Sequence, residues 1–421
     1  MPGDLFAGLR VLELGQYVAI PYCAELFAHG GADVITVEAI EGAPTRHNSM
    51  LVPGEGRQYI IKARGKRGIP INLASPAGRD LAERIALSCD IVLTNLRPGL
   101  VETLGLDYDS LAAKNPRIVY GEITAFGRHG PDGDKAGVDI VVQAASGMMV
   151  SGRGMDDGRP LAIEALLNDY TAGSMLAFGV TAALRQRDIT GQGQKVSGSL
   201  MQAALAMQTA LANVFHVFDT WKTEFVDWLH EEKPPIDEAV QRRRRSMAGE
   251  PWFYNTYETR DGALAIAGVG QMRKKLATLL EVDDPMATDP TFVMPDDPRP
   301  YMASVVASAR ARIHQWSRDN LIQLLETNGI PCAPVMFHEE VLVGEQARAN
   351  NFVSTFDHPV VGPITMPTTP VHFSRSRYES GTTSPAYGEH TNDILAELGI
   401  SAARRAELVA QGIVGLPGGI G

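Results

Sequence analysis

Short apolar runs alternate with amphipathic stretches through the first 200 residues. Pro21 suits the first turn of one helix, and Ser75 followed by Pro76 suits the start of another. The runs that predict strands are Leu9–Leu14, Asp33–Glu38, a run ending at Leu73, Asp90–Thr94 and Arg117–Ile123. This alternation predicts an α/β fold in which helices cover both faces of a parallel sheet.

The pattern changes after Leu200. A long apolar helix is expected over Leu200–Phe218, followed by a charged linker, Trp221–Pro251, with two adjacent prolines. Two short strands then meet at an Arg-Asp-Gly turn, and helices follow to about Asn328. From Ile330 onward, proline-rich strand-like pieces and a helix at Asn392–Glu397 are expected to rejoin the first lobe.

These patterns divide the chain into four parts. Its 421 residues suffice for two lobes. The parts are a large domain over 1–200, a helix and linker over 201–250, a small α+β domain over 251–329, and a C-terminal segment over 330–421 that returns to the large domain.

The amino-acid composition limits the kinds of partner that the protein can bind. The net charge of −11 argues against nucleic acid or an anionic membrane as a general partner. Three cysteines without a CxxC pair and ten scattered histidines indicate neither a disulfide framework nor a metal site. No run approaches the roughly 18 apolar residues of a membrane span, and the start lacks a signal-peptide pattern. We therefore expect a cytoplasmic protein that uses no metal.

The segment Val11–Ala39 looks like a dinucleotide-binding strand-helix-strand unit, with Glu38 closing its second strand. Such a unit carries G-x-G-x-x-G at its first turn, so that the backbone can approach a pyrophosphate. Here that turn holds a single glycine, Gly15, which argues against an NAD-dependent dehydrogenase.

Three stretches are candidates for chemistry. Asn95, Leu96 and Arg97 follow a predicted parallel strand, where open α/β sheets bind ligands, although position alone slightly favours a capped strand-to-helix loop. Asp169 lies at the start of an apolar helix, either as a capping carboxylate or as a partly desolvated nucleophile. The loop Gly268–Gly270 is either an ordinary turn or a mobile cover that presents backbone N–H groups. The arginines 242–245 suit a solvated helix face better than a phosphate site.

In this order, these pieces resemble the class III CoA-transferase family, the group of formyl-CoA transferase and carnitine CoA-transferase-like proteins that also includes α-methylacyl-CoA racemase. The resemblance covers most of the chain, through LRVLELGQYVAIPYCAELFAHGGADVITVEA, ARGKRGIPINLASPAGR, NLRPGLVETLGLDYDSL, LNDYTAGSMLAFGVTAAL, TGQGQKVSGSLMQAAL and DGALAIAGVGQ. It implies a Rossmann-like large domain and a small domain in an interlocked homodimer. It also implies that acyl-CoA is a substrate and that no cofactor is permanently bound.

The resemblance also implies site residues. Asp169 corresponds to the family's nucleophile, and Gly268 and Gly270 belong to the glycine loop that covers it. Asp139 either supports that loop or is a buried structural carboxylate. The implied contacts of coenzyme A are Val18, Ala19, Leu73, Asn95, Leu96, Arg97, Lys135 and Gly137.

The sequence departs from the family pattern in places. Ala39 and Thr103 stand where some members carry arginines, so Arg46, Lys66, Arg67 and Arg97 are left to share the phosphates. Val138 stands where the racemases have a catalytic histidine.

Three functions follow from the resemblance. The first is a CoA-transferase that moves CoA from an acyl-CoA thioester to a free carboxylic acid, through an aspartyl anhydride and an aspartyl-CoA thioester. The second is an acyl-CoA racemase, which Val138 disfavours because that reaction needs two acid–base groups. The third is a CoA-binding protein without turnover.

Overall fold

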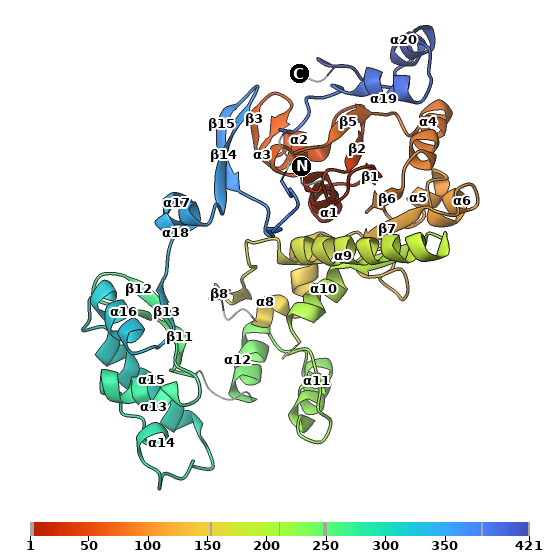
Figure 1. The fold of residues 1–421 in the computed structure, drawn as a ribbon. Coiled ribbons are helices and arrows are strands. Elements are labelled where there is room, and N and C mark those ends of the chain that lie inside the picture. The colour runs from red at the N-terminus through yellow and green to blue at the C-terminus, as the bar shows by residue number, and fades with distance from the viewer. Residues whose placement is uncertain (1–3, 152–153, 210, 247–250, 380–381, 420–421) are drawn as a thin grey trace. The chain divides into compact units, whose positions relative to one another are not determined.

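The computed structural model describes residues 4–151, 154–209, 211–246, 251–379 and 382–419. The chain divides into two compact units (Figure 1). The first unit consists of Met1–Asp156, Pro160–Asn213 and Gln346–Gly421, and the second of Asp157–Arg159 and Val214–Glu345.

A six-stranded sheet forms the centre of the first unit. Its strand order is β10-β7-β6-β1-β2-β5, and every neighbouring pair is parallel. The strands are β1 (Arg10–Leu14), β2 (Asp33–Glu38), β5 (Arg67–Pro70), β6 (Ile91–Thr94), β7 (Val119–Thr124) and β10 (Lys195–Ser199). The predicted parallel α/β fold is therefore confirmed.

Alternate strand residues point to opposite faces of this sheet, and a separate helical layer covers each face (Figure 1). Val11 belongs to the hydrophobic core on one face, and Leu12 to the core on the other. The first layer consists of α1 (Ala19–His29), α7 (Asp139–Ala145), α9 (Leu167–Thr190) and α10 (Leu200–Met207). The second consists of α4 (Pro76–Leu87), α5 (Leu100–Thr103), α6 (Tyr108–Ala112), α19 (Thr391–Glu397) and α20 (Ala402–Ala410).

Short elements complete this unit and its borders. The hairpins are β3 (Met50–Val52) with β4 (Glu55–Gly56), β8 (Met155–Asp156) with β9 (Arg159–Pro160), and β14 (Val353–His358) with β15 (Gly362–Pro367). The short helices are α2 (Pro44–His47), α3 (Arg57–Lys62), α8 (Met148–Ser151) and α18 (Glu345–Ala349).

Helices α1 and α9 approach each other closely at Gly173. A Cβ atom there would lie 2.6 Å from the carbonyl oxygen of Ala19. Relief of this clash would require a shift of the backbone in a closely packed interior. Glycine is otherwise a poor choice inside a helix. This glycine therefore sets the distance between the two helix starts.

We expect Gly173→Ala to destabilise the protein by about 1–3 kcal/mol, because overpacking outweighs the gain in helix propensity. Urea unfolding measures this. The control is Gly198→Ala, since no heavy atom lies within 4 Å of the added Cβ at Gly198. Equal unfolding midpoints for Gly173→Ala and the wild type would contradict the close approach.

The second unit has its own core around an antiparallel sheet, β11-β12-β13. The strands are β11 (Tyr254–Glu258), β12 (Ala263–Ala267) and β13 (Cys332–Pro334). Its helices are α11 (Thr220–Glu232), α12 (Ile236–Ser246), α13 (Met272–Leu280), α14 (Pro285–Thr288), α15 (Arg299–Ile313), α16 (Arg318–Thr327) and α17 (His338–Val343). The predicted pair of strands around the Arg-Asp-Gly turn is confirmed.

Two expectations for the middle of the chain are wrong. The long helix Leu200–Phe218 stops at Met207, where the Gln208 amide donates to the carbonyl oxygens of Ala204 and Ser146. The charged linker instead contains α11 and α12, which lie on either side of the two prolines. Prolines mark the break between helices, but the flanking residues are good helix formers.

The C-terminal part also differs from expectation. β13 begins two residues after Ile330 and pairs with β12, so the chain returns to the first unit only after Glu345. The expected helix Asn392–Glu397 is present as α19, and α20 follows it. No helix among the described residues is long and apolar enough to cross a bilayer.

Candidate active site

A cavity of about 300 Å³ opens at the carboxyl ends of β1, β6 and β7. Open α/β sheets bind ligands at this edge, where the order of connections reverses. Here the reversal falls between the neighbouring strands β1 and β6. Eight of the predicted site residues line this one cavity: Val18, Ala19, Asn95, Leu96, Arg97, Lys135, Gly137 and Asp169.

The loops after β1 and β6 are joined by a reciprocal pair of hydrogen bonds. The backbone N–H of Gln16 donates to Asn95 Oδ1 at 2.8 Å, and Asn95 Nδ2 donates to the Gln16 carbonyl oxygen at 2.9 Å. Asn95 therefore fixes the two loops that flank the reversal point. The adjacent Leu96 and Arg97 are left facing the cavity.

Asp169 occupies the first turn of α9 and is 9% exposed. Burial, together with the negative charge of Asp139, raises the pKa of Asp169 to about 7, while the backbone N–H of Ala19 acts in the opposite direction. Ala19 is the first residue of α1, which starts two residues before the expected Pro21. The Asp169 carboxylate thus lies against the start of another helix and in the wall of the cavity.

Asp139, and not Asp169, caps α9. One oxygen of Asp139 accepts from the backbone N–H groups of Asn168 at 2.8 Å and Asp169 at 3.1 Å. The other oxygen accepts from Gln143 Nε2 at 2.6 Å. Because Asp139 accepts from two of the orphan N–H groups of α9, the Asp169 carboxylate is free of the capping role that its position in the sequence allows.

Three further residues singled out in the sequence line this cavity, each in a different environment. Gly137 has no room for a side chain, since a Cβ atom would lie 2.7 Å from that of Ala125. Lys135 is largely exposed and pairs with Asp132 at 2.5 Å. Val138 is 47% exposed and lines the cavity directly before α7.

Leu73 lines a second cavity, of about 290 Å³, beside the carboxyl ends of β1, β2 and β5. Leu96 lines both cavities. Gly268 and Gly270 belong to the second unit, where they lie between β12 and α13. The left-handed φ of 61° at Gly270 explains the glycine there.

Three of the four basic side chains expected to bind the phosphates of coenzyme A are paired with carboxylates instead. Arg46 is fully buried and holds Glu38 with two hydrogen bonds, at 2.7 and 3.0 Å. Lys66 is buried against Glu13, at 2.7 Å.

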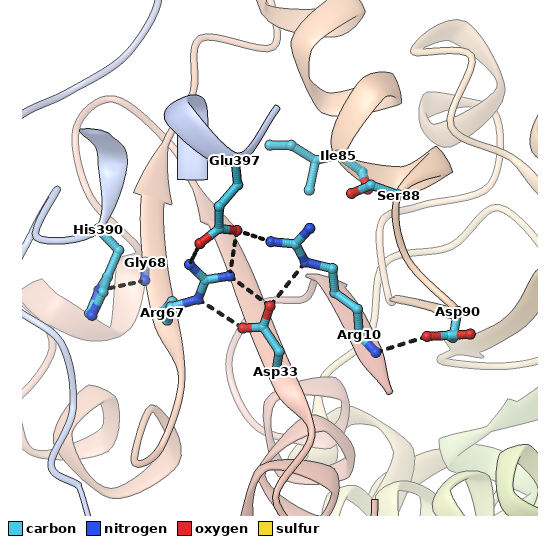
Figure 2. A network of polar contacts seen from close by, with 9 residues as sticks. All are labelled: Arg10, Asp33, Arg67, Gly68, Ile85, Ser88, Asp90, His390 and Glu397. Atoms are coloured by element: carbon cyan, nitrogen blue, oxygen red, sulfur yellow. Dashed lines mark hydrogen bonds and ion pairs between the residues drawn. The ribbon is translucent and has the colours of Figure 1, made fainter. Parts of the chain in front are cut away.

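Arg67 lies at the opposite edge of the sheet, in a network with Arg10, Asp33 and Glu397 (Figure 2). These residues belong to the amino ends of β1, β2 and β5 and to α19. Arg97 alone of the four lines the cavity, and it makes no ion pair within the described part of the chain.

Several wall residues carried no signal in the sequence. Asn48 and Gln58 come from the α2–α3 region, which has no clear periodicity, and Tyr17 adopts a left-handed φ of 63° in the turn after β1. Among the described residues, no three His, Cys, Asp or Glu side chains gather as a metal ion would require.

Comparison with known proteins gives one consistent result. The family described as CoA-transferase family III matches residues 6–391. Succinate–glutarate CoA-transferase of Agrobacterium fabrum is 30% identical over 409 residues, which cover 93% of this chain and 95% of that protein. Formyl-CoA:oxalate CoA-transferase of Streptomyces avermitilis is 29% identical and covers 97% of this chain and 98% of that protein.

Solved structures agree with these relatives. The crystal structure of Rv3272 from Mycobacterium tuberculosis is 26% identical, with a TM-score of 0.76 over 94% of this chain and 100% of that one. A CAIB/BAIF family protein from Brucella suis is 29% identical, with a TM-score of 0.72 over 93% of this chain and 99% of that one. The chain therefore belongs to CoA-transferase family III and is a CoA-transferase enzyme.

Proposed function

We propose that the enzyme moves coenzyme A from an acyl-CoA thioester to a free carboxylic acid by covalent catalysis at Asp169. The observation that carries this proposal is a buried carboxylate in the wall of the cavity, with a pKa raised to about 7. Such a group is more basic, and so more nucleophilic, than an ordinary aspartate, yet it is substantially ionised near neutral pH.

The reaction begins on the donor. A carboxylate oxygen of Asp169 attacks the thioester carbonyl carbon, and CoA leaves as its thiolate, which gives a mixed anhydride. The thiolate then attacks the aspartyl carbonyl carbon and expels the donor acid as a carboxylate. An aspartyl-CoA thioester remains on the enzyme.

The second half repeats these steps in reverse. The acceptor carboxylate attacks the aspartyl thioester and releases the CoA thiolate, which leaves an anhydride between Asp169 and the acceptor. The thiolate attacks the acceptor acyl carbon, which yields the new thioester and restores the Asp169 carboxylate. Over the whole cycle one thioester is consumed and one is formed, so no external energy source is needed.

Two neighbours support this chemistry. The start of α1 presents the Ala19 N–H to the Asp169 carboxyl group, where oxyanion charge develops when a nucleophile attacks the aspartyl carbonyl. Asp139 acts as a positioning residue, because it fixes the first turn of α9. We also propose that Gly268 and Gly270 shield the anhydride from water, a role that rests on the family resemblance.

Transfer is favoured over racemisation by two side chains. Inversion of an α-carbon needs an acid–base group on each face of that carbon. Val138 offers no proton, and the Asp139 carboxylate is committed to N–H donors on both of its oxygens.

A 2-methylacyl-CoA incubated with the enzyme in D2O should therefore gain no α-deuterium, while labelled CoA moves between acids. Succinyl-, acetyl- and aromatic acyl-CoA donors, each tested against a panel of acids by mass spectrometry, find the substrate pair. Deuterium uptake as fast as turnover, without transfer to any acid, would establish a racemase instead.

We further propose that the active form is an interlocked homodimer. The support is the family resemblance and a set of apolar side chains left in water, including Met175 at 60% and Phe178 at 71% exposure on α9. Sedimentation over a wide dilution series should show a dimer throughout, because interlocked chains cannot separate without unfolding. A folded, active monomer at low concentration excludes interlocking. The cytoplasmic location stays a prediction.

A further inference from the structure

The second cavity has acidic but no basic side chains in its walls. Its walls are mostly apolar side chains and backbone, with two amides and two carboxylates, and no lysine, arginine or histidine contributes to them. The lining residues are Leu14, Gly15, Gln16, Val37, Glu38, Ala39, Ile40, Glu41, Ile71, Asn72, Leu73, Ala74 and Leu96. An anionic group would find no cation in these walls.

The two cavities adjoin along the same edge of the sheet. Leu96 lines both cavities. Asn95 lines the first cavity and Gln16 the second, and two hydrogen bonds join these residues. Coenzyme A is a long molecule, with its thiol at one end and its adenosine 3′-phosphate at the other. If the thioester meets Asp169 in the first cavity, the adenosine end can extend past Leu96 to the second.

Of the basic side chains near the second cavity, Arg97 lines only the first cavity. Three others make hydrogen bonds within the chain. Arg46 is held by Glu38, whose carboxylate also accepts from the Ala43 N–H. Arg79 donates to the carbonyl oxygens of Leu73 and Ala74 at 3.5 and 3.0 Å. His47 Nε2 lies 2.8 Å from the Glu41 carbonyl oxygen.

The wall itself suits a neutral group. Val37, Ile40, Ile71 and Leu73 offer apolar surface to a purine ring. Glu41 is exposed at this cavity, and its carboxylate would repel a phosphate that carries about two negative charges.

From this juxtaposition we propose that the enzyme binds the adenosine end of CoA through its base and ribose in the second cavity and does not read the 3′-phosphate. It therefore accepts 3′-dephospho-CoA thioesters as substrates alongside ordinary CoA thioesters. This proposal rests on the proposed transfer function for its kinetic test, but its binding test is independent of turnover.

The first experiment compares the two thioesters with the wild-type enzyme. We expect kcat/KM for an acyl-CoA and for its 3′-dephospho counterpart to agree within about tenfold, because the lost phosphate removes no charge-assisted hydrogen bond. Calorimetric titration with CoA and with dephospho-CoA should give Kd values within the same range. A preference for the phosphorylated forms above tenfold in both measurements overturns the proposal. Absence of transfer with either thioester, while both ligands bind equally, overturns the transfer function alone.

The second experiment installs a cation. Ala39 is exposed directly after β2 and lines the second cavity, so Ala39→Arg places a guanidinium at its rim. We expect the Kd ratio of dephospho-CoA to CoA to rise about tenfold in this variant. Ala39→Gln, which adds length without charge, should leave the ratio unchanged. An unchanged ratio in Ala39→Arg, or a tenfold fall in CoA affinity for Arg79→Ala without a matching fall for dephospho-CoA, overturns the proposal.

Discussion

Replacement of Asp169 by alanine or asparagine is expected to abolish CoA transfer while the protein still folds and binds CoA. Without a carboxylate at this position, neither the anhydride nor the aspartyl thioester can form, so the covalent route is lost rather than slowed. Initial rates with labelled CoA measure the loss. Glu164→Gln, which removes an exposed carboxylate shortly before α9, is the matched control and should keep wild-type activity. Residual transfer within a hundredfold of wild type would rule out the mechanism.

The Asp169→Asn variant also has a stability consequence that tests the burial of Asp169. The pKa of Asp169 is raised from 3.8 to about 7, so ionisation opposes folding increasingly as the pH rises between these values. Asp169→Asn should therefore be more stable than the wild type at pH 8, by on the order of 2 kcal/mol, and this gain should vanish near pH 4. Urea unfolding at both pH values measures the difference. An identical difference at the two pH values would mean that the carboxylate is solvated.

Asp139→Asn is expected to produce the second large effect, on the pH dependence of transfer. The wild-type rate should fall as the pH drops below about 7, because protonation removes the nucleophile. The negative charge of Asp139 contributes to the raised pKa of Asp169, although burial contributes more. Loss of this charge should move the acidic limb of kcat/KM down by roughly one pH unit. Burial should still keep the pKa of Asp169 above the ordinary range of an aspartate.

The same substitution should cost about 2 kcal/mol of stability. The introduced amide can still accept from the α9 N–H groups, but its NH2 group would face the Gln143 amide, which donates to the Asp139 carboxylate in the wild type. Asp134→Asn, in the loop before α7 and exposed, is the control and should shift neither stability nor pH profile. An acidic limb that stays in place in Asp139→Asn would show that the two carboxylates are not coupled.

The sequence predicted most of the large sheet because its central strands are continuous apolar runs, as in Leu9–Leu14. The edge strand β10 was not predicted, since Lys195–Ser199 contains a single apolar residue and pairs on one side only. The apolar run after Leu200 suggested a long helix, because composition alone does not show where a chain turns.

The candidate active site was also predicted in part. The family motifs predicted eight residues that line the first cavity, but not the reasons for their positions. The ion pairs of Lys66 and Arg67 join residues 53 and 330 positions apart, so no local pattern reports them. The capping of α9 by Asp139 is likewise a tertiary contact, formed across 29 residues.

The most direct test of covalent catalysis is mass spectrometry of the enzyme quenched during turnover with acyl-CoA. Covalent catalysis predicts a peptide in which Asp169 carries CoA as a thioester, and its conversion to a hydroxamate at Asp169 when hydroxylamine is added. Hydroxylamine without acyl-CoA should leave the enzyme unmodified and active. Ongoing transfer with Asp169 unmodified, or with the label on another side chain, would contradict this mechanism.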